Sequence, residues 1–144
     1  MNHACESQTL TAELQRRIPT MDRRCYRKIL HISLKDHVTN KEVHVKIQQA
    51  TGPHEDLLTI IKRHKLQCYG QVSRSSGLAK TILLGTVKGG RRQGRQKKRW
   101  EDNIREWTGL DFGKSQRAVE SREKWRKLVA KSSVVPQRPL RLRD

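Results

Sequence analysis

Acidic residues, aromatic residues and long apolar runs are all scarce in this sequence of 144 residues. Asp and Glu number 14 against 32 Lys and Arg, which gives a formal net charge of +18, and aromatic residues make up only 4%. Leu, Ile, Val and Phe together number 32, just above the fraction of about 20% below which a highly charged chain is expected to be disordered. We therefore expect no large core and predict a mainly α fold, with several short amphipathic helices around a small core.

The lack of apolar runs also bears on the partners and the location. No run approaches the ~20 residues that span a bilayer, and the N-terminus carries no apolar segment of a secretory signal. We therefore expect no membrane partner and a nuclear or cytoplasmic location. The pI of about 10.7 exceeds the value of about 9 at which a basic domain is interpreted as nucleic-acid binding.

Cysteine is also scarce, which argues against disulfides and structural metals. Cys5, Cys25 and Cys68 are odd in number and form no CxxC pair, so the sequence predicts no disulfide framework and no zinc knuckle. His64 and Cys68 have the i, i+4 spacing of two ligands on one helical face, but a structural zinc site takes four. We expect no metal and no cofactor.

Signatures of catalysis are absent from the sequence as well. Nucleotidyl transfer needs carboxylates that together hold two divalent metals. The adjacent acids at 55–56 and 101–102 instead begin predicted helices, where they favour the helix dipole. No P-loop, no Gly-x-Ser-x-Gly turn and no His-Glu-x-x-His motif occurs. The sequence therefore predicts a protein that is not an enzyme and takes no small-molecule substrate.

Residues 88–100 carry the most informative motif, with seven cations, three glycines and no acid. Blocks of like charge resist burial and persist where solvent or a counter-charged partner takes them up. The predicted nucleic-acid-binding residues are Lys88, Arg91, Arg92, Arg95, Lys97, Lys98, Arg99 and Trp100. A solvated basic loop without a ligand is the alternative. Residues 96–99 also fit a nuclear-import signal.

Trp100 has two interpretations. An aromatic ring directly after a run of cations is typical of a platform on which bases stack. However, Trp100, Ile104 and Trp107 share one helical stripe, which favours packing for both tryptophans. Trp125 is predicted to lie in the core.

Apolar spacing and capping signals divide the chain into short helices. Pro19 ends or kinks the first one, Thr39 and Glu42 form a capping box before the third, and Gly109 stops the one that begins at Trp100. On the fourth, Leu57, Ile60, Ile61, His64 and Cys68 are expected to line one face. The predicted helices cover 9–18, 21–32, 40–49, 54–68, 100–108 and 114–130, with 78–87 either a short helix or extended.

These signals give five segments. They are a flexible N-terminus (1–8), a helical segment (9–87), a basic Gly/Arg/Lys loop (88–99), C-terminal helices (100–130) and a disordered tail (131–144). The tail contains prolines and cations without a helical period.

Six motifs in order resemble the C-terminal region of LINE-type (non-LTR) retrotransposon reverse transcriptases, over nearly the whole chain. They are 24–30 (RCYRKIL), 35–40 (KDHVTN), 52–58 (GPHEDLL), 65–74 (KLQCYGQVSR), 90–100 (GRRQGRQKKRW) and 122–126 (REKWR). The resemblance implies that the endonuclease and polymerase domains of the family lie upstream of this region. It also implies that the region helps to hold template RNA or target DNA.

The sequence departs from the family at two positions. Cys68 stands where members usually carry tryptophan, and Gln71 where they carry histidine. Loss of a core tryptophan weakens helix packing by up to about 5 kcal/mol, which suggests a decaying copy.

Three functions follow from these observations. The first is a non-catalytic module that binds RNA or DNA through its phosphate backbone. The second is an expressed retroelement remnant without a selected activity. The third is a basic interaction helix for a protein or membrane partner, which would need a larger apolar face than 21–32 offers.

Overall fold

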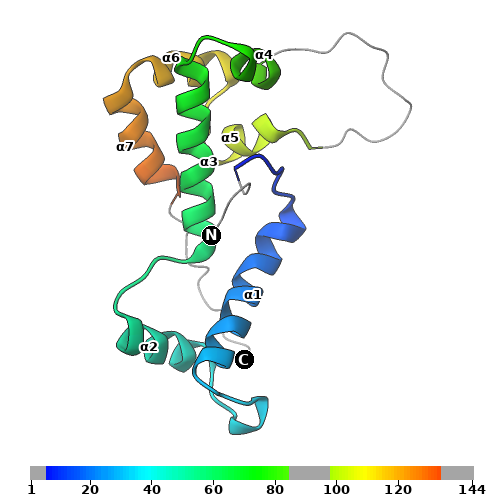
Figure 1. Ribbon diagram of the computed structural model, residues 1–144, viewed down its shortest axis with the longest axis vertical. Coiled ribbons are helices and arrows are strands. Elements are labelled where there is room, and N and C mark those ends of the chain that lie inside the picture. The colour runs from blue at the N-terminus through cyan, green and yellow to red at the C-terminus, as the bar shows by residue number, and fades with distance from the viewer. Residues whose placement is uncertain (1–5, 85–97, 134–144) are drawn as a thin grey trace, which may run out of the picture.

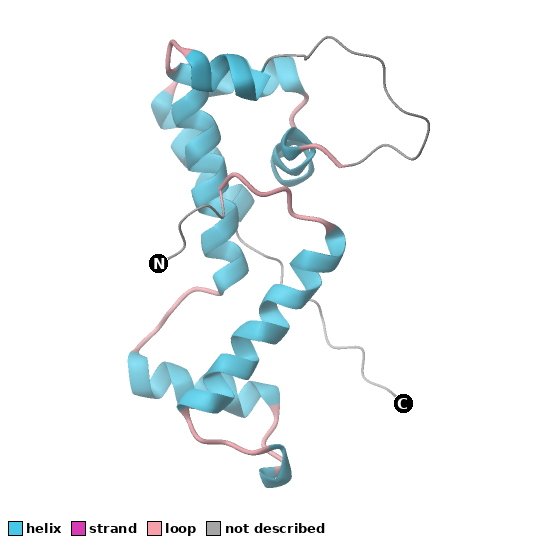
Figure 2. Ribbon diagram, turned by 45° about the vertical axis from the view of Figure 1, so that its right-hand side comes forward, coloured by secondary structure: helices cyan, strands magenta, loops and turns pink. Residues whose placement is uncertain are grey.

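The computed structural model describes residues 6–84 and 98–133, and over these ranges the chain is helical and contains no strand (Figures 1 and 2). The predicted mainly α class is confirmed. The elements are α1 (Ala12–Ile29), the 3-10 turn η1 (Leu34–Asp36), α2 (Asn40–Thr51), α3 (Leu57–Arg74), α4 (Leu78–Leu84), α5 (Trp100–Thr108), α6 (Phe112–Glu120) and α7 (Arg122–Ser133).

Helix α3 is the centre of the arrangement. It contacts α1, α4, α6 and α7, while α1 also contacts α2 and α5 also contacts α7. Figure 1 shows α4 to α7 grouped around α3 in one half of the molecule, and α1 with α2 in the other half. The molecule thus has a larger half around α3 and a smaller half formed by α1 and α2.

Several helix boundaries differ from the prediction. A single helix, α1, runs through Pro19, because the missing proline N–H removes only one backbone hydrogen bond and the turns on both sides still pack on the rest of the protein. Conversely, the helix predicted over 114–130 is interrupted at Ser121, whose extended backbone separates α6 from α7. Helix α7 continues to Ser133, three residues into the segment predicted as a tail.

The capping signals were correct. Thr39 Oγ1 accepts from the N–H of Glu42 at 3.3 Å, and the Glu42 carboxylate accepts from the N–H of Thr39 at 3.0 Å. Gly109 ends α5 in the left-handed region, with φ of 69°. Local hydrogen bonding therefore sets the start of α2 and the end of α5.

The buried face of α3 is not the predicted one. Of the five residues expected to share it, only Ile61 is buried, and the buried set is Leu58, Ile61, Lys62, Lys65, Leu66, Tyr69, Gly70 and Ser73. The predicted face contained no lysine. Two lysines are buried instead, so the buried stripe is rotated around the helix.

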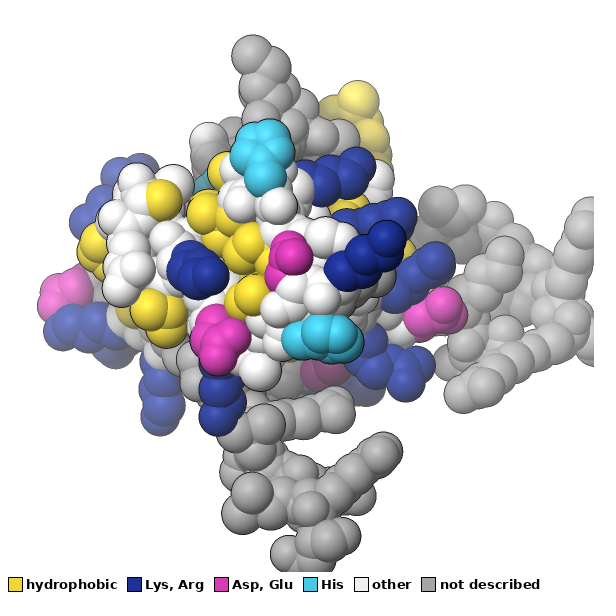
Figure 3. Space-filling model, turned by 90° about the horizontal axis from the view of Figure 1, so that it is seen from below, with side chains coloured by type: hydrophobic (Ala, Val, Ile, Leu, Met, Phe, Trp, Pro, Cys, Tyr) yellow, Lys and Arg dark blue, Asp and Glu magenta, His cyan; other side chains and the backbone are white. Residues whose placement is uncertain are grey.

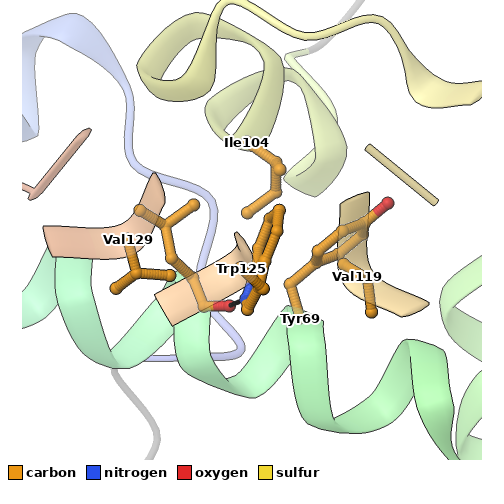
Figure 4. Packing of buried hydrophobic residues seen from close by; sticks show 6 residues of the cluster. Tyr69, Ile104, Val119, Trp125 and Val129 are labelled. Atoms are coloured by element: carbon orange, nitrogen blue, oxygen red, sulfur yellow. Dashed lines mark hydrogen bonds between the residues drawn. The ribbon is translucent and has the colours of Figure 1, made fainter. Parts of the chain in front are cut away.

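The main core joins α3, α5, α6 and α7. Its buried members are Leu66, Tyr69, Ile104, Val119, Trp125 and Val129 (Figure 4). The indole N–H of Trp125 donates to the carbonyl oxygen of Leu66 at 3.0 Å. This bond lays the edge of the ring directly on the backbone of α3 and confirms Trp125 as a core residue.

Glycine at position 70 makes this approach possible. A Cβ atom there would lie 2.2 Å from Trp125 Nε1 and 2.5 Å from Trp125 Cδ1, far inside van der Waals contact. Because the ring is buried and hydrogen-bonded, it has little freedom to move away. The close packing of α3 on α7 therefore requires glycine at this position.

We predict that Gly70→Ala lowers the free energy of unfolding by about 3 kcal/mol, because overpacking a filled core costs about 1–3 kcal/mol. Urea unfolding followed by circular dichroism measures the change. Gly113→Ala in α6 is the matched control, because nothing lies within 4 Å of its added Cβ, and it should be neutral or stabilising. Equal stability of the two variants would contradict this account of Gly70.

Candidate nucleic-acid interface

The residues predicted to bind nucleic acid fall into two groups. Lys88, Arg91, Arg92, Arg95 and Lys97 lie outside the residues that the structure describes. Lys98, Arg99 and Trp100 lie at the start of α5 and are described.

Lys98 and Arg99 are in different environments. The ammonium of Lys98 forms an ion pair with the carboxylate of Glu106, in the last turn of α5. The side chain of Arg99 is exposed, and its backbone N–H donates to Asp102 Oδ2 at 2.7 Å. Arg99 is therefore the cation of this pair that a phosphate could reach without breaking an ion pair.

Trp100 packs within the protein. Its indole N–H donates to the carbonyl oxygen of Glu6 at 2.6 Å, and its ring centroid lies 6.0 Å from that of Tyr69. Trp100 and Trp107 are both half-buried against the main core. The packing interpretation is therefore the one that the structure shows, and Trp100 is not a free platform for stacking.

The ammonium group of Lys65 lies beside these two rings and is fully buried. It is 4.9 Å from the ring centroid of Trp100 and 5.6 Å from that of Trp107. It donates to the carbonyl oxygen of Gln8 at 2.7 Å and to Asn103 Oδ1 at 2.8 Å. Aromatic faces and carbonyl oxygens thus take the place of water around this cation.

Asn103 completes the contact between α5 and the N-terminal segment. Its side-chain amide accepts from the N–H of Leu10 and donates to the carbonyl oxygen of Leu10, both at 2.8 Å. Residues 6–8 belong to the segment predicted as flexible, yet the carbonyls of Glu6 and Gln8 both accept hydrogen bonds from side chains of the larger half. The N-terminal segment is therefore fastened to α3 and α5.

The structure also reveals a basic groove, which we define as the surface cavity of about 750 Å³ along the C-terminal half of α1. Its lining residues are Thr20, Arg23, Arg24, Arg27, Lys28, His31, Ile32, Ser33 and Asn40. Four cations and no acid line this groove. Seen from the α1–α2 end, Lys and Arg side chains lie around an apolar area, with acidic and histidine side chains also beside it (Figure 3).

The backbone at the end of α1 shapes the groove. The N–H of Ile32 donates to the carbonyl of Arg27 at 2.9 Å and that of His31 to Lys28 at 3.2 Å, while His31 takes a left-handed φ of 53°. These are the bonds of a Schellman motif, which reverses the chain. The turn places residues 31–33 beside the last two turns of α1.

Internal bonds orient two of the four cations. Arg27 Nη2 donates to the carbonyl oxygen of Val38 at 2.6 Å and to Asn40 Oδ1 at 3.3 Å, and Arg23 bonds to Thr20 Oγ1 at 3.3 Å. Arg24 and Lys28 are exposed. Over residues 6–84 and 98–133, none of the four has a carboxylate within ion-pair distance.

The sequence predicted a basic amphipathic helix over 21–32 but not the groove. Its walls come from α1, the turn after it and the start of α2, and only the positive φ at His31 brings them together. No periodicity in the sequence encodes that turn.

We also searched the described residues for metal sites and for membrane-spanning helices. Over these residues no group of three or more His, Cys, Asp or Glu side chains could hold a metal ion, and His64 and Cys68 are half-buried. Nor is any helix there long and apolar enough to span a membrane. No protein family model, no curated protein and no solved structure matches this chain.

Burial and the charge of Lys98 lower the pKa of Lys65 to about 8, from an ordinary value of 10.5. Below about pH 8 both the folded and the unfolded states keep the proton. Between about pH 8 and 10.5 the folded state loses it first, so the free energy of unfolding rises with pH. We predict a gain of about 2 kcal/mol between about pH 7 and 9.5, since one pKa unit corresponds to about 1.36 kcal/mol.

The measurement is urea unfolding of the wild type and of Lys65→Met across this range. The difference between the two isolates Lys65 from Cys68, whose pKa burial raises and which therefore acts in the opposite direction. If the variant does not fold, the titration of the Lys65 side chain by NMR gives the same pKa. Parallel pH profiles, or a pKa near 10.5, would contradict the prediction.

Proposed function

We propose that this protein is a non-catalytic module that binds the phosphate backbone of RNA or DNA. The observation that carries the proposal is the basic groove, where four cations face solvent-accessible space without an acidic partner among the described residues. Uncompensated cations around a concave surface attract a polyanion strongly, because field lines concentrate in a cleft with low-dielectric walls.

The chemistry of the groove suits phosphate. The planar guanidinium presents paired N–H donors that match two phosphate oxygens. Arg27 is held in place by Val38 and Asn40, so little side-chain entropy remains to be lost when it binds. Arg24 and Lys28, both exposed, supply adaptable contacts on the rim.

The whole chain adds charge of the same sign. Its net charge of +18 favours association with any nucleic acid at low salt. The predicted basic residues at 88–99 would supply a second contact, joined to the larger half through Arg99. Both contacts agree with the role in holding RNA or DNA that the resemblance to retrotransposon reverse transcriptases implies. The basic cluster at 96–99 also fits a nuclear-import signal and supports a nuclear location.

The decisive experiment is a salt titration of binding to single-stranded RNA, duplex DNA and heparin. We predict that Arg24→Ala/Lys28→Ala reduces the slope of log affinity against log salt on duplex DNA by up to about 1.8, because each phosphate contact contributes about 0.9. Arg91→Ala/Arg92→Ala/Arg95→Ala tests the loop in the same way. Fluorescence anisotropy between about 50 and 200 mM salt gives each slope.

Lys124→Ala/Arg126→Ala is the matched control, because it removes the same charge from exposed positions of α7. It should change the slope less than the groove variant does. Equal slopes for groove and control variants, together with equal affinity for heparin and nucleic acid, would show that charge alone causes the binding and that the groove is not a site.

A further inference from the structure

Helix α1 leaves its apolar stripe in solvent. It is one of the two longest helices in the described part of the chain, with 18 residues, and none of them is buried. Leu14, Met21 and Ile29 are 40%, 55% and 62% exposed, Cys25 is exposed and Ile18 is half-buried. We call these five residues the α1 stripe.

A different face of α1 contacts the rest of the protein. Gln15, Pro19, Asp22, Tyr26 and Leu30 are half-buried, and they recur every three or four residues, as one face of a helix does. At about 100° per residue, the centre of this face lies about 100° around the helix from the centre of the α1 stripe. Apart from the half-buried Ile18, the stripe therefore lies outside the face of α1 that packs on α2 and α3.

We propose that the α1 stripe is a docking surface for an amphipathic helix of another protein that carries acidic residues beside its apolar seam. Leu14, Ile18, Met21 and Cys25 follow one another at intervals of four, three and four residues. This spacing is that of a coiled-coil seam. Leu14 to Ile29 spans about 22 Å, which is about four turns of a partner helix.

Charge complementarity gives the partner its acidic character. Arg17, Arg24 and Lys28 lie along one edge of the α1 stripe, and all three are exposed. Arg17 is paired with Glu13 at 3.7 Å, whereas Arg24 and Lys28 have no carboxylate within ion-pair distance among the described residues. The nearest acid on the other edge, Asp22, accepts a hydrogen bond from the Tyr26 hydroxyl at 2.9 Å and is directed to the inner face. A helix with Glu or Asp beside its seam would pair with the cationic edge.

A second copy of this chain fits less well. In an antiparallel pair of α1 helices the two cationic edges would face each other, and each chain carries a net charge of +18. A lipid surface also fits less well, because the stripe is only about 80° wide and contains no aromatic residue. Interfacial helices usually present a broader apolar face with Trp or Phe.

Two 18-residue peptides test the proposal. Both carry Leu at the two seam positions of each heptad, and one has Glu and the other Lys at the flanking positions. At physiological salt the Glu peptide should bind the full-length protein at least about tenfold more tightly than the Lys peptide does. The Met21→Gln/Ile29→Gln substitutions should lower the affinity of the protein for the Glu peptide by at least about tenfold.

Both substituted side chains are more than half exposed, so the urea midpoint of this variant should equal that of the wild type. Its binding to duplex DNA should also be unchanged, because neither residue lines the basic groove. Arg24 and Lys28 lie both in the basic groove and on the cationic edge of the α1 stripe, so the groove variant should weaken the binding of DNA and of the Glu peptide alike. The Met21→Gln/Ile29→Gln variant should lose the Glu peptide alone, and it therefore separates a failure of the docking proposal from a failure of the proposed function.

Three results would overturn the docking proposal. The first is equal binding of the Glu and Lys peptides. The second is an unchanged affinity of Met21→Gln/Ile29→Gln for the Glu peptide. The third is failure of the Glu peptide to bind while Met21 and Ile29 are needed for a different interaction. That interaction would be either binding to vesicles that contain about one third phosphatidylserine or self-association in sedimentation.

Discussion

The buried ammonium of Lys65 holds together three elements of the larger half of this protein. A cation removed from water must find substitutes for its hydration shell, and here they come from two separate parts of the chain. The N-terminal segment supplies the Gln8 carbonyl, and α5 supplies the Asn103 amide and the rings of Trp100 and Trp107. If any one of them moved away, an incompletely solvated charge would remain inside. The cation therefore fixes the N-terminal segment, α3 and α5 relative to one another, although the chain has few apolar residues with which to do so.

The contact of α3 with α7 complements this polar centre with close apolar packing. Gly70 lets the Trp125 ring reach the backbone of α3, where the indole N–H meets the Leu66 carbonyl. Tyr69 lies 5.5 Å from that ring, between centroids, and its hydroxyl is hydrogen-bonded to Ser115 at 2.8 Å. Trp125 and Tyr69, each with its polar atom paired, thus help to give a small core a single arrangement. The larger half then provides a rigid support from which α1 and α2 extend.

Features that depend on residues close together in the sequence could be predicted from it, whereas features that depend on residues far apart in the sequence could not. The capping box at Thr39 and the stop at Gly109 are local, and both were predicted correctly. The buried face of α3 was not, because Lys65 is buried only through partners 38 and 57 residues away. Likewise the basic groove depends on the left-handed turn at His31. A positive φ is uncommon for any residue other than glycine, and although histidine adopts it more often than most, the sequence alone does not predict it at this position. Helix spacing predicted two separate amphipathic helices over 9–18 and 21–32, but only the structure shows that they form one helix whose apolar stripe is largely exposed.

The enclosure of Lys65 also makes it a chemical reporter. Reagents that acylate amines react with the neutral, accessible amine, and Lys65 is fully buried whereas most of the other lysines that the structure describes lie at or near the surface. Its acylation therefore requires the N-terminal segment to separate from α5. The rate at which Lys65 becomes labelled in the folded protein therefore measures how often the N-terminal segment separates from α5 while the rest of the chain stays folded.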